Sequence, residues 1–455
     1  MIELLVAIGV AAILSAVAIF ALQPAALLQE SRDAKRLSEL SDLNRAVGLF
    51  IADRSTASVG AAHTIYISVP DSSITPPETK SDCGALGLVP PTGWAYECKH
   101  PDDYRKVNGE GWMPINFESM STGSPFATLP VDPRNDAAAG HYYAYVTGGS
   151  YALTGQMESA KYLQRVALAD KGTDFTRLEF GSTQLWARAS GLVGYFSLDR
   201  VFQGEDPNNP GFFFPMTEEA SESGNIAAVI GSVNVVNGKV GGALDFSPAF
   251  SKYLRLMQTS PEISLALREH ATIAGWFNWK SGTRSLLRDN TGIVPGQPAN
   301  KFEEQNKGWL LLGINHVPQL IFRVADKTFP LNLQGQPLPG CLATRTCTCV
   351  GMRNNGYAAV CEPQTVANLQ NSWHHYALVK KGAEITYYLD SKLVYRNDPA
   401  VDPVGNFASS CGPCWYVSRN GEDPFEAVST LADEVRFYNR PFPASEIKAY
   451  YEITK

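Results

Sequence analysis

Hydrophobic and polar positions divide the chain into stretches with different patterns. Between residues 1 and 22 only Glu3 and Ser15 are polar, so this segment is apolar all round. Further on, apolar residues recur at three- and four-residue steps with charges between them, at Leu37, Leu40, Leu43, Val47 and Phe50. That spacing places the apolar side chains on one face of a helix. We therefore predict one long helix over residues 1–52, whose second half packs one face on a domain.

The segment 1–22 has the length of a membrane span, because 22 helical residues extend about 33 Å. No positively charged stretch precedes it and no small-residue cleavage site follows it, which argues against a removed secretory signal. Pro24 lacks a backbone N–H and is expected to kink the helix. The carboxylate of Glu3 costs about 3 kcal/mol in lipid without a partner, so we predict that Glu3 has a specific counter-charge.

Residues 53–180 are rich in turns and contain short strand patterns, such as the stretch "HTIYISV". The stretch "HYYAYVTGGSYALTGQME" predicts a β-hairpin, with strands at 142–146 and 151–157 around Gly148, Gly149 and Ser150. Together with the helix, these strands predict an α+β domain in which the helix packs on a small antiparallel sheet.

A connector at 181–190 leads into residues 191–455, where many short alternating segments follow one another. Helical patterns do not alternate with these strands, so a parallel sheet is excluded. We predict an all-β, antiparallel two-sheet sandwich of the jelly-roll type. The chain of 455 residues therefore holds two globular domains behind its N-terminal helix.

Composition narrows the partners and the compartment. The net charge is −7, and the chain has no excess of basic residues for binding phosphates, which argues against nucleic acid as a partner. All eight cysteines lie beyond residue 80, and an even count behind a membrane-crossing segment predicts an exported protein with disulfides. We expect one bridge between Cys83 and Cys98. Three more are expected within the second domain, with their connectivity left open, among Cys341, Cys347, Cys349, Cys361, Cys411 and Cys414.

The N-terminal residues carry a resemblance to a known family. The stretch "MIELLVAIGVAAILSAVAIF", followed by "SRDAKRLSELSDLNRAVGLFIAD", resembles the N-terminal helix of type IV pilins and pseudopilins. Mature chains of that family usually begin with a methylated Phe, and the resemblance implies that two residues are missing before Met1. It also implies that Glu3 neutralises the N-terminal amine of an adjacent subunit and sets the assembly register. Where many pilins have a proline this chain has Phe20, so we expect any helix melting to move toward Pro24.

A second stretch resembles the other end of the same domain. In bacterial pilins and pseudopilins a Leu-Pro-x-Asp-Pro element precedes a hairpin of the pattern Tyr-x-Tyr, turn, Tyr-x-Leu, followed by Glu-Ser. The positions that match are Leu129, Pro130, Asp132, Pro133, Tyr143, Tyr145, Tyr151, Leu153 and Glu158. Some pseudopilins bind calcium near this loop, but for Asp132 we favour a structural turn over a metal ligand.

The second domain resembles the laminin-G-like, concanavalin A-like jelly-roll family over nearly its whole length. The matching segments come in the family's order, at 191–199, 241–246, 272–277, 373–379 and 387–394, and close on "ADEVRFYNRPFPASEIKAYY". The resemblance implies a domain that binds glycans or proteins, in some members with structural calcium.

Candidate chemistry in this domain is sparse. Asp199, Asp245 and Asp433 stand within otherwise apolar strands, where a buried carboxylate requires a partner; calcium or an arginine would serve. A retaining glycosidase needs two carboxylates about 5 Å apart, and we find no such acidic strand motif, since Asp433 and Glu434 alternate across a strand. The motif "CGPCW" lacks the strand-to-helix context of a redox site, and the cysteine spacing fits no standard zinc site. Of His374 and His375, we expect one packed and one exposed. We therefore predict no enzyme.

These patterns predict a type IV pilus-like filament subunit. Its helices would form a homopolymer after residence in the bacterial inner membrane. Its jelly roll would be displayed on the extracellular filament for adhesion to glycans, surfaces, proteins or partner cells. The alternatives are a minor or tip adhesin pilin, a pseudopilin of a type II secretion system, and a membrane-anchored carbohydrate-active enzyme.

Overall fold

The computed structural model describes residues 24–54, 58–163, 172–206, 209–219, 221, 225–247, 252–258, 269–281, 284–289, 310–314, 320–324, 327–330, 370–396, 415–417 and 429–455. The chain forms two compact units. The first holds the described residues up to Leu88 together with Trp94–Trp186, and the second holds Val89–Gly93 and those from Ala187 onward. The predicted span 1–22, with Glu3, lies outside the described residues. Within the described part of the chain, no helix combines the length and apolar character that crossing a bilayer requires.

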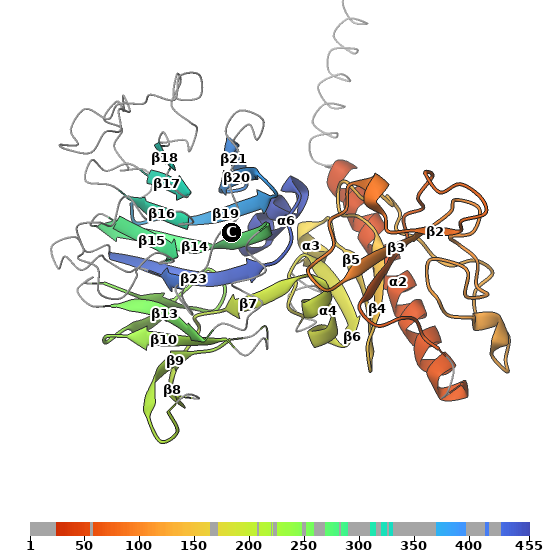
Figure 1. Ribbon diagram of the computed structural model, residues 1–455, viewed down its shortest axis with the longest axis horizontal. Helices are drawn as coiled ribbons and strands as arrows, with labels where there is room; N and C mark the ends of the chain where they lie inside the picture. The colour runs from red at the N-terminus through yellow and green to blue at the C-terminus, as the bar shows by residue number, and fades with distance from the viewer. Residues whose placement is uncertain are drawn as a thin grey trace, which may run out of the picture. The chain divides into compact units, whose positions relative to one another are not determined.

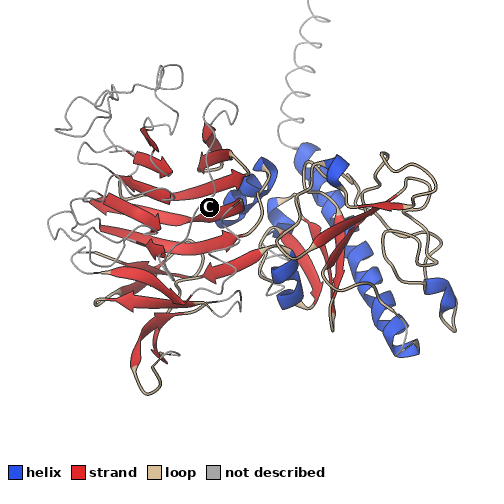
Figure 2. Ribbon diagram, viewed as in Figure 1, coloured by secondary structure: helices blue, strands red, loops and turns tan. Residues whose placement is uncertain are grey.

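The first unit packs the long helix α2 (Pro24–Asp53) on a six-stranded sheet (Figures 1 and 2). The strands lie in the order β2-β3-β1-β4-β5-β6, with only β1 and β3 parallel. They are β1 (Thr64–Ile67), β2 (Lys80–Ser81), β3 (Ala95–Lys99), β4 (Tyr143–Thr147), β5 (Tyr151–Gln156) and β6 (Arg177–Gly181). Short helical segments are η1 (Gly84–Leu86), η2 (Phe117–Ser119) and α3 (Ala160–Tyr162); α4 (Thr183–Ala189) crosses the boundary between the units, in the segment predicted as a connector.

The buried face of α2 follows the predicted periodicity. Leu40, Leu43, Val47 and Phe50 are almost completely buried, and each such side chain contributes about 1.5–3 kcal/mol by leaving water. The helix packs tightly on the sheet at Gly155 in β5, where an added Cβ would lie 2.9 Å from the Leu40 side chain. The residue at this position is therefore small because the helix occupies the space of a side chain.

The predicted hairpin is confirmed. β4 and β5 pair in antiparallel register, with Tyr145 opposite Leu153, and the turn lies where the Gly-Gly-Ser sequence predicts it. Pro24 is the first residue of α2; the kink predicted there involves preceding residues that lie outside the described part.

The second unit is a sandwich of two antiparallel sheets (Figure 2). One sheet has the order β18-β17-β16-β15-β22-β13-β10-β9-β8, and the other β11-β12-β23-β14-β19-β20-β21 with β7 paired to β23. The strands of the first are β8 (Val201–Glu205), β9 (Phe213–Thr217), β10 (Ile226–Ile230), β13 (Tyr253–Gln258), β15 (Arg284–Asp289), β16 (Leu310–Ile314), β17 (Leu320–Val324), β18 (Lys327–Pro330) and β22 (Trp415–Val417). Those of the second are β7 (Leu192–Phe196), β11 (Asn234–Asn237), β12 (Gly242–Asp245), β14 (His270–Ser281), β19 (Trp373–Lys381), β20 (Glu384–Leu389), β21 (Lys392–Arg396) and β23 (Ser429–Tyr438).

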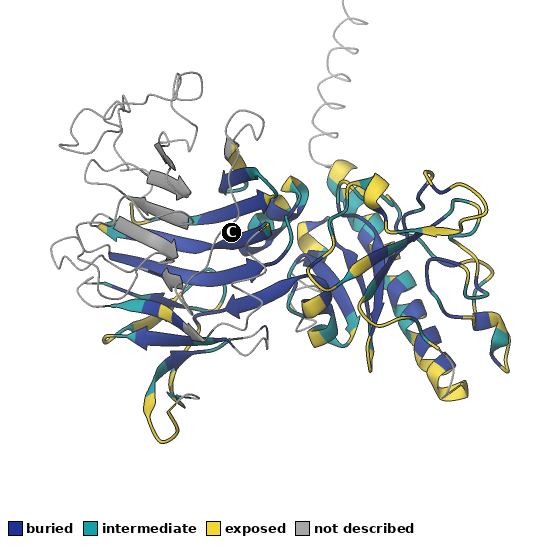
Figure 3. Cartoon of the chain, viewed as in Figure 1, coloured by how far each residue is buried: buried dark blue, intermediate teal, exposed yellow. Residues whose placement is uncertain are grey.

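The core of this unit lies between the two sheets (Figure 3). Val229, Leu254 and Val417 come from one sheet, and Ile273 and Phe437 from the other. The outer side of the second sheet is covered in part by helix α6 (Ala444–Thr454), where the Trp276 indole donates to the Thr454 hydroxyl at 3.0 Å. The sandwich predicted from strand spacing is therefore present, whereas helix α6 was not predicted.

Candidate functional site

A buried cluster of charged side chains joins α2 to two distant segments of the first unit. The guanidinium of Arg36, fully buried, donates to Asp132 through Nε (2.6 Å) and Nη2 (2.9 Å). Its Nη1 lies 2.8 Å from Asp33 Oδ1 and 2.7 Å from Glu158 Oε1. One cation on the helix thus holds three carboxylates.

Asp33, also fully buried, ties the helix to the segment after β5. Its carboxylate accepts from the backbone N–H groups of Glu158 and Ser159 and from the Ser159 hydroxyl. Glu158 in turn receives a bidentate contact from Arg32, at 2.8 and 2.6 Å. Because a buried charge is costly unless it is paired and hydrogen-bonded, this network fixes the docking position of α2 rather than adding surface attraction.

The pKa values follow from this pairing. For Glu158, burial by itself raises the pKa, but the hydrogen bond from Arg32 and the charge of Arg36 outweigh it and lower the pKa to about 2. For Arg36, burial works against the cation, yet the hydrogen bond to Asp132 and the nearby carboxylates raise its pKa above the ordinary value. At neutral pH both groups are therefore ionised.

Two tyrosine hydroxyls of the β4–β5 hairpin also donate hydrogen bonds to α2. The Tyr143 hydroxyl donates to Glu39 at 2.7 Å, and the Tyr151 hydroxyl donates to the side-chain oxygen of Asn44 at 2.8 Å. Asp132 was predicted as a structural turn residue; its Oδ1 does accept from the backbone N–H groups of Arg134 and Asn135, but it is also a main partner of Arg36.

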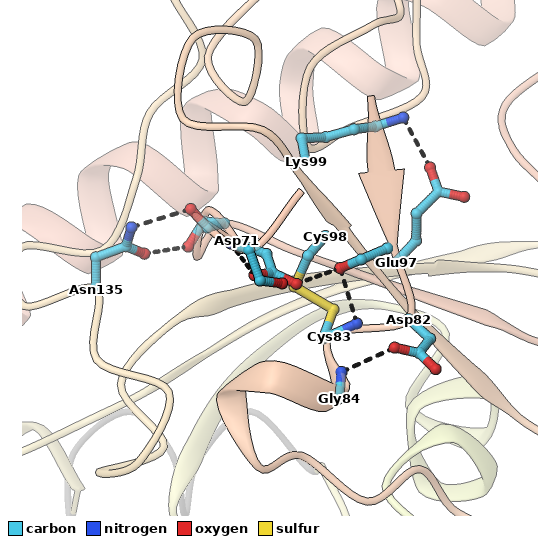
Figure 4. Close-up of a disulfide and its surroundings, with 11 residues drawn as sticks. Asp71, Asp82, Cys83, Gly84, Glu97, Cys98, Lys99 and Asn135 are labelled. Carbon is cyan, nitrogen blue, oxygen red and sulfur yellow. Dashed lines mark hydrogen bonds and ion pairs between the residues drawn. A yellow bond between two sulfur atoms is a disulfide. The ribbon is translucent and has the colours of Figure 1, made fainter. Parts of the chain in front are cut away.

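The predicted disulfide between Cys83 and Cys98 is present and buried, and it links η1 to β3 (Figure 4). Asp71 lies beside it and accepts from Ser73 and from the Ser81 hydroxyl (Figure 4). The carboxylate therefore holds Ser81, whose hydroxyl in turn accepts from the backbone N–H of Cys83. The other six cysteines lie outside the described residues.

The three aspartates predicted as calcium ligands do not form one ligand set. Asp433 Oδ2 accepts from the backbone N–H groups of Lys239 (2.7 Å) and Val240 (3.1 Å), Asp199 accepts from Gly242 N, and Asp245 accepts from Ser247 N. Asp199 and Asp433 thus hold the β11–β12 turn. Among the described residues there is no group of three or more acidic, histidine or cysteine side chains placed to hold a metal ion.

Asp433 is unusual because it is fully buried and only one of its oxygens has a hydrogen-bond partner. Burial and the neighbouring charge of Glu434 raise its pKa to about 8, although the two backbone N–H groups act in the opposite direction. The residue therefore keeps its proton at neutral pH. Glu434 has different partners, the hydroxyls of Tyr195 and Tyr450 and the guanidinium of Arg436.

Of the two histidines, His375 is packed as expected, whereas His374 is only partly exposed. His375 is 1% exposed and packs against Trp276, and burial lowers its pKa to about 3. The His374 side chain is 14% exposed and contacts Ser372 and Asp390. The contact between His374 and Asp390 could not be predicted from the sequence, because Asp390 lies in the turn between β20 and β21 and His374 lies in β19.

Comparison with known proteins finds only distant structural similarity, with TM-scores below 0.5. No family model matches the sequence, and no curated protein matches it. Domain 4 of AbnA, a GH43 extracellular arabinanase from Geobacillus stearothermophilus solved with arabinotriose, is 12% identical with a TM-score of 0.34, over 56% of this chain and 96% of that one.

Two further structures are similar at the same level. The binding domain of Paraclostridial Mosquitocidal Protein 1 is 11% identical with a TM-score of 0.35, over 57% of this chain and 52% of that one. Trypanosoma rangeli sialidase, solved with the inhibitor DANA, is 12% identical with a TM-score of 0.36, over 68% and 43%. This chain therefore spans only about half of those two proteins.

Proposed function

We propose that this protein is the subunit of a type IV pilus-like filament, with its N-terminal helix in the filament core and its β-sandwich unit displayed outside. The observation that carries the proposal is the Arg36 cluster. Asp132 and Glu158, the acidic residues of the two pilin-like motifs, both contact Arg36 on α2. The tyrosines of the hairpin motif, Tyr143 and Tyr151, donate to the same helix.

The motif residues therefore share one physical task, which is to fix a long helix on its sheet. A polymer held together through such helices requires this attachment, because any force on the globular unit reaches the polymer through it. Glu3 supplies the assembly contact in the proposal by pairing with the N-terminal amine of a neighbouring chain.

The second unit is proposed to bind a glycan or protein on surfaces or partner cells. Its β8–β9 hairpin exposes Phe202, Phe212 and Phe213, at 43%, 56% and 58% (Figure 3). Contiguous exposed apolar surface marks interaction sites, and in this hairpin the rings of Phe212 and Phe214 contact each other, with centres 6.4 Å apart. No catalytic role is assigned to this unit within the proposed filament function.

The test is filament formation in a bacterium that makes the full chain together with a pilus assembly system. Glu3→Ala is expected to leave the protein in the inner membrane and to remove it from sheared surface filaments. Glu118→Ala, a change at an exposed position of the first unit, is the matched control and should assemble normally. Normal filaments from Glu3→Ala would refute the pairing.

Copy number in the same preparation separates the alternatives. A main subunit accounts for most of the filament mass, whereas a minor or tip pilin is present in a few copies. A pseudopilin gives no long surface filament unless it is overproduced. Glycan hydrolysis by the purified chain would favour the membrane-anchored enzyme instead.

A further inference from the structure

The second unit contains a serine, a histidine and an aspartate linked in series. The Ser372 hydroxyl lies 2.8 Å from His374 Nε2, and His374 Nδ1 lies 2.8 Å from Asp390 Oδ2. Ser372 precedes β19, His374 is its second residue, and Asp390 occupies the turn between β20 and β21.

The chemistry of the three groups sets the direction of both hydrogen bonds when the imidazole is neutral. A carboxylate only accepts, so Nδ1 of His374 carries the proton and donates it to Asp390. In neutral imidazole the other nitrogen then has a free electron pair, so Nε2 accepts from the Ser372 hydroxyl. This is the arrangement in which histidine acts as the base for a serine nucleophile and the aspartate holds its tautomer.

The aspartate is itself held in place. Its second oxygen accepts from the backbone N–H of His375 at 3.0 Å, and its own N–H donates to the His375 carbonyl at 2.8 Å. His374 is supported from behind by Phe277, with ring centres 5.9 Å apart. The imidazole is therefore positioned by both a carboxylate and packed core side chains.

The three groups are nevertheless accessible. The side chains of His374 and Asp390 are 14% and 27% exposed, and Ser372 is partly exposed. The neighbouring His375, by contrast, is 1% exposed and stacks under α6. On the core side, Phe277 is buried and lies between the rings of His374 and Tyr376, with ring centres 5.9 and 6.3 Å apart. A short acyl group is the substrate class considered, because it needs no enclosed acyl pocket.

We propose that Ser372, His374 and Asp390 hydrolyse short-chain acyl esters, such as acetyl esters. The Ser372 oxygen bonds to the ester carbonyl carbon while its proton passes to His374 Nε2. The carbon–alkoxide bond breaks, and the alkoxide leaves as the alcohol with that proton. Water then adds to the acyl-serine and gives its proton to His374. The acid departs, and Ser372 takes the proton back. Asp390 is a positioning residue throughout.

The experiment uses the purified full chain with two probes. A fluorophosphonate reports on an activated serine, and the modified residue is located by peptide mass spectrometry. Hydrolysis of p-nitrophenyl acetate measures turnover. We expect labelling at Ser372, and a loss of turnover of roughly 100-fold or more in Ser372→Ala and in His374→Gln, because general-base catalysis contributes at least that much. Asp390→Asn is expected to lower kcat and leave KM nearly unchanged.

Ser121→Ala is the matched control. The Ser121 hydroxyl also donates to an aspartate, Asp53 at 2.6 Å, but Ser121 has no histidine partner. In Ser121→Ala, fluorophosphonate labelling at Ser372 and turnover of p-nitrophenyl acetate should equal those of the unchanged chain. If His374→Gln does not fold, Ser372→Ala decides alone, since it removes one partly exposed oxygen.

The proposal is overturned if folded protein is not labelled at Ser372, or if turnover persists in Ser372→Ala. Labelling that is unchanged in folded His374→Gln would also overturn it. None of these outcomes bears on filament assembly, which is measured with Glu3→Ala.

Discussion

Replacing Arg36 by methionine tests whether the charged cluster fixes α2 on the first unit. Methionine has a similar length, so packing is largely kept while the cation is removed. The change leaves three carboxylates close together in a buried site, those of Asp33, Asp132 and Glu158. Removing one partner of a buried ion pair typically costs 3–5 kcal/mol.

The remaining partners of the three carboxylates keep the expected loss of stability within this range. Each carboxylate keeps other donors: Arg32 for Glu158, and backbone N–H groups for Asp33 and Asp132. The loss is therefore the lost hydrogen bonds to a charged group, about 1.5–3 kcal/mol each before relaxation, plus mutual repulsion. We expect a net loss of about 3–5 kcal/mol in the free energy of opening α2.

Hydrogen exchange of peptides from 24–53 in the full chain measures this loss directly, separately from the second unit. Arg45→Met is the control on the same helix, because the Arg45 side chain is 74% exposed, and surface pairs contribute at most about 1 kcal/mol. The penalty of Arg36→Met should also shrink when the pH is lowered toward 4, since protonation relieves carboxylates that have lost their cation. Equal exchange in both variants, or a penalty independent of pH, would refute the role of the cluster.

Two further predictions concern single side chains. The pKa of Asp433 lies near 8 in the folded chain, above the unfolded value of about 4, so the folded state holds the extra proton between these values. The free energy of unfolding of the second unit should therefore fall as pH rises through this window, by up to about 1.4 kcal/mol per pH unit. In urea unfolding, Asp433→Asn should flatten this dependence of stability on pH. Parallel pH dependences in the two proteins would show that Asp433 is not protonated in the folded state. Cys83→Ser removes a disulfide that spans 15 positions and should lower the stability of the first unit by about 3 kcal/mol. The loss is measured as faster hydrogen exchange in peptides from 80–99. Unchanged exchange rates would show that other contacts hold the loop without the disulfide.

The sequence predicted the elements whose signal is local. The spacing of Leu40, Leu43 and Val47 predicts the buried face of α2, and the Gly-Gly-Ser turn between tyrosine-rich segments predicts the β4–β5 hairpin. The Cys83–Cys98 bridge was expected because the two residues enclose a short loop. In the second unit, alternating segments predicted strands such as β14 and β19.

The charged cluster was missed although its register is visible in the sequence. Asp33 and Arg36 continue the three- and four-residue steps of Leu40, Leu43 and Val47 toward the N-terminus, so they lie on the buried face. Polar residues are normally assigned to the solvent-exposed face of a helix. Burial of Arg36 is stabilised by its ion pairs with the distant residues Asp132 and Glu158. Their pairing depends on tertiary structure, which no local pattern encodes.

Two other differences have local causes. The segment "YYLDSKLV" forms parts of two strands, β20 and β21, because Asp390 and Ser391 both have positive φ and make a two-residue turn. Helix α6 was missed, although Ile447, Tyr450 and Ile453 recur at three-residue steps after Pro443. The serine–histidine–aspartate series depends on that turn, which brings Asp390 back to the start of β19.

The long sequence separations within the Arg36 cluster have a consequence for synthesis on the ribosome. The partner of Arg36, Asp132, is synthesised 96 positions later, and the backbone N–H of Glu158 that binds Asp33 is synthesised 125 positions later. At a synthesis rate of about 5–20 residues per second, the charged and apolar face of α2 stays uncovered for roughly 6–25 seconds. During this interval the helix emerges before the sheet that receives it, so we expect Leu40, Leu43 and Val47 to be accessible to a chaperone or a membrane surface.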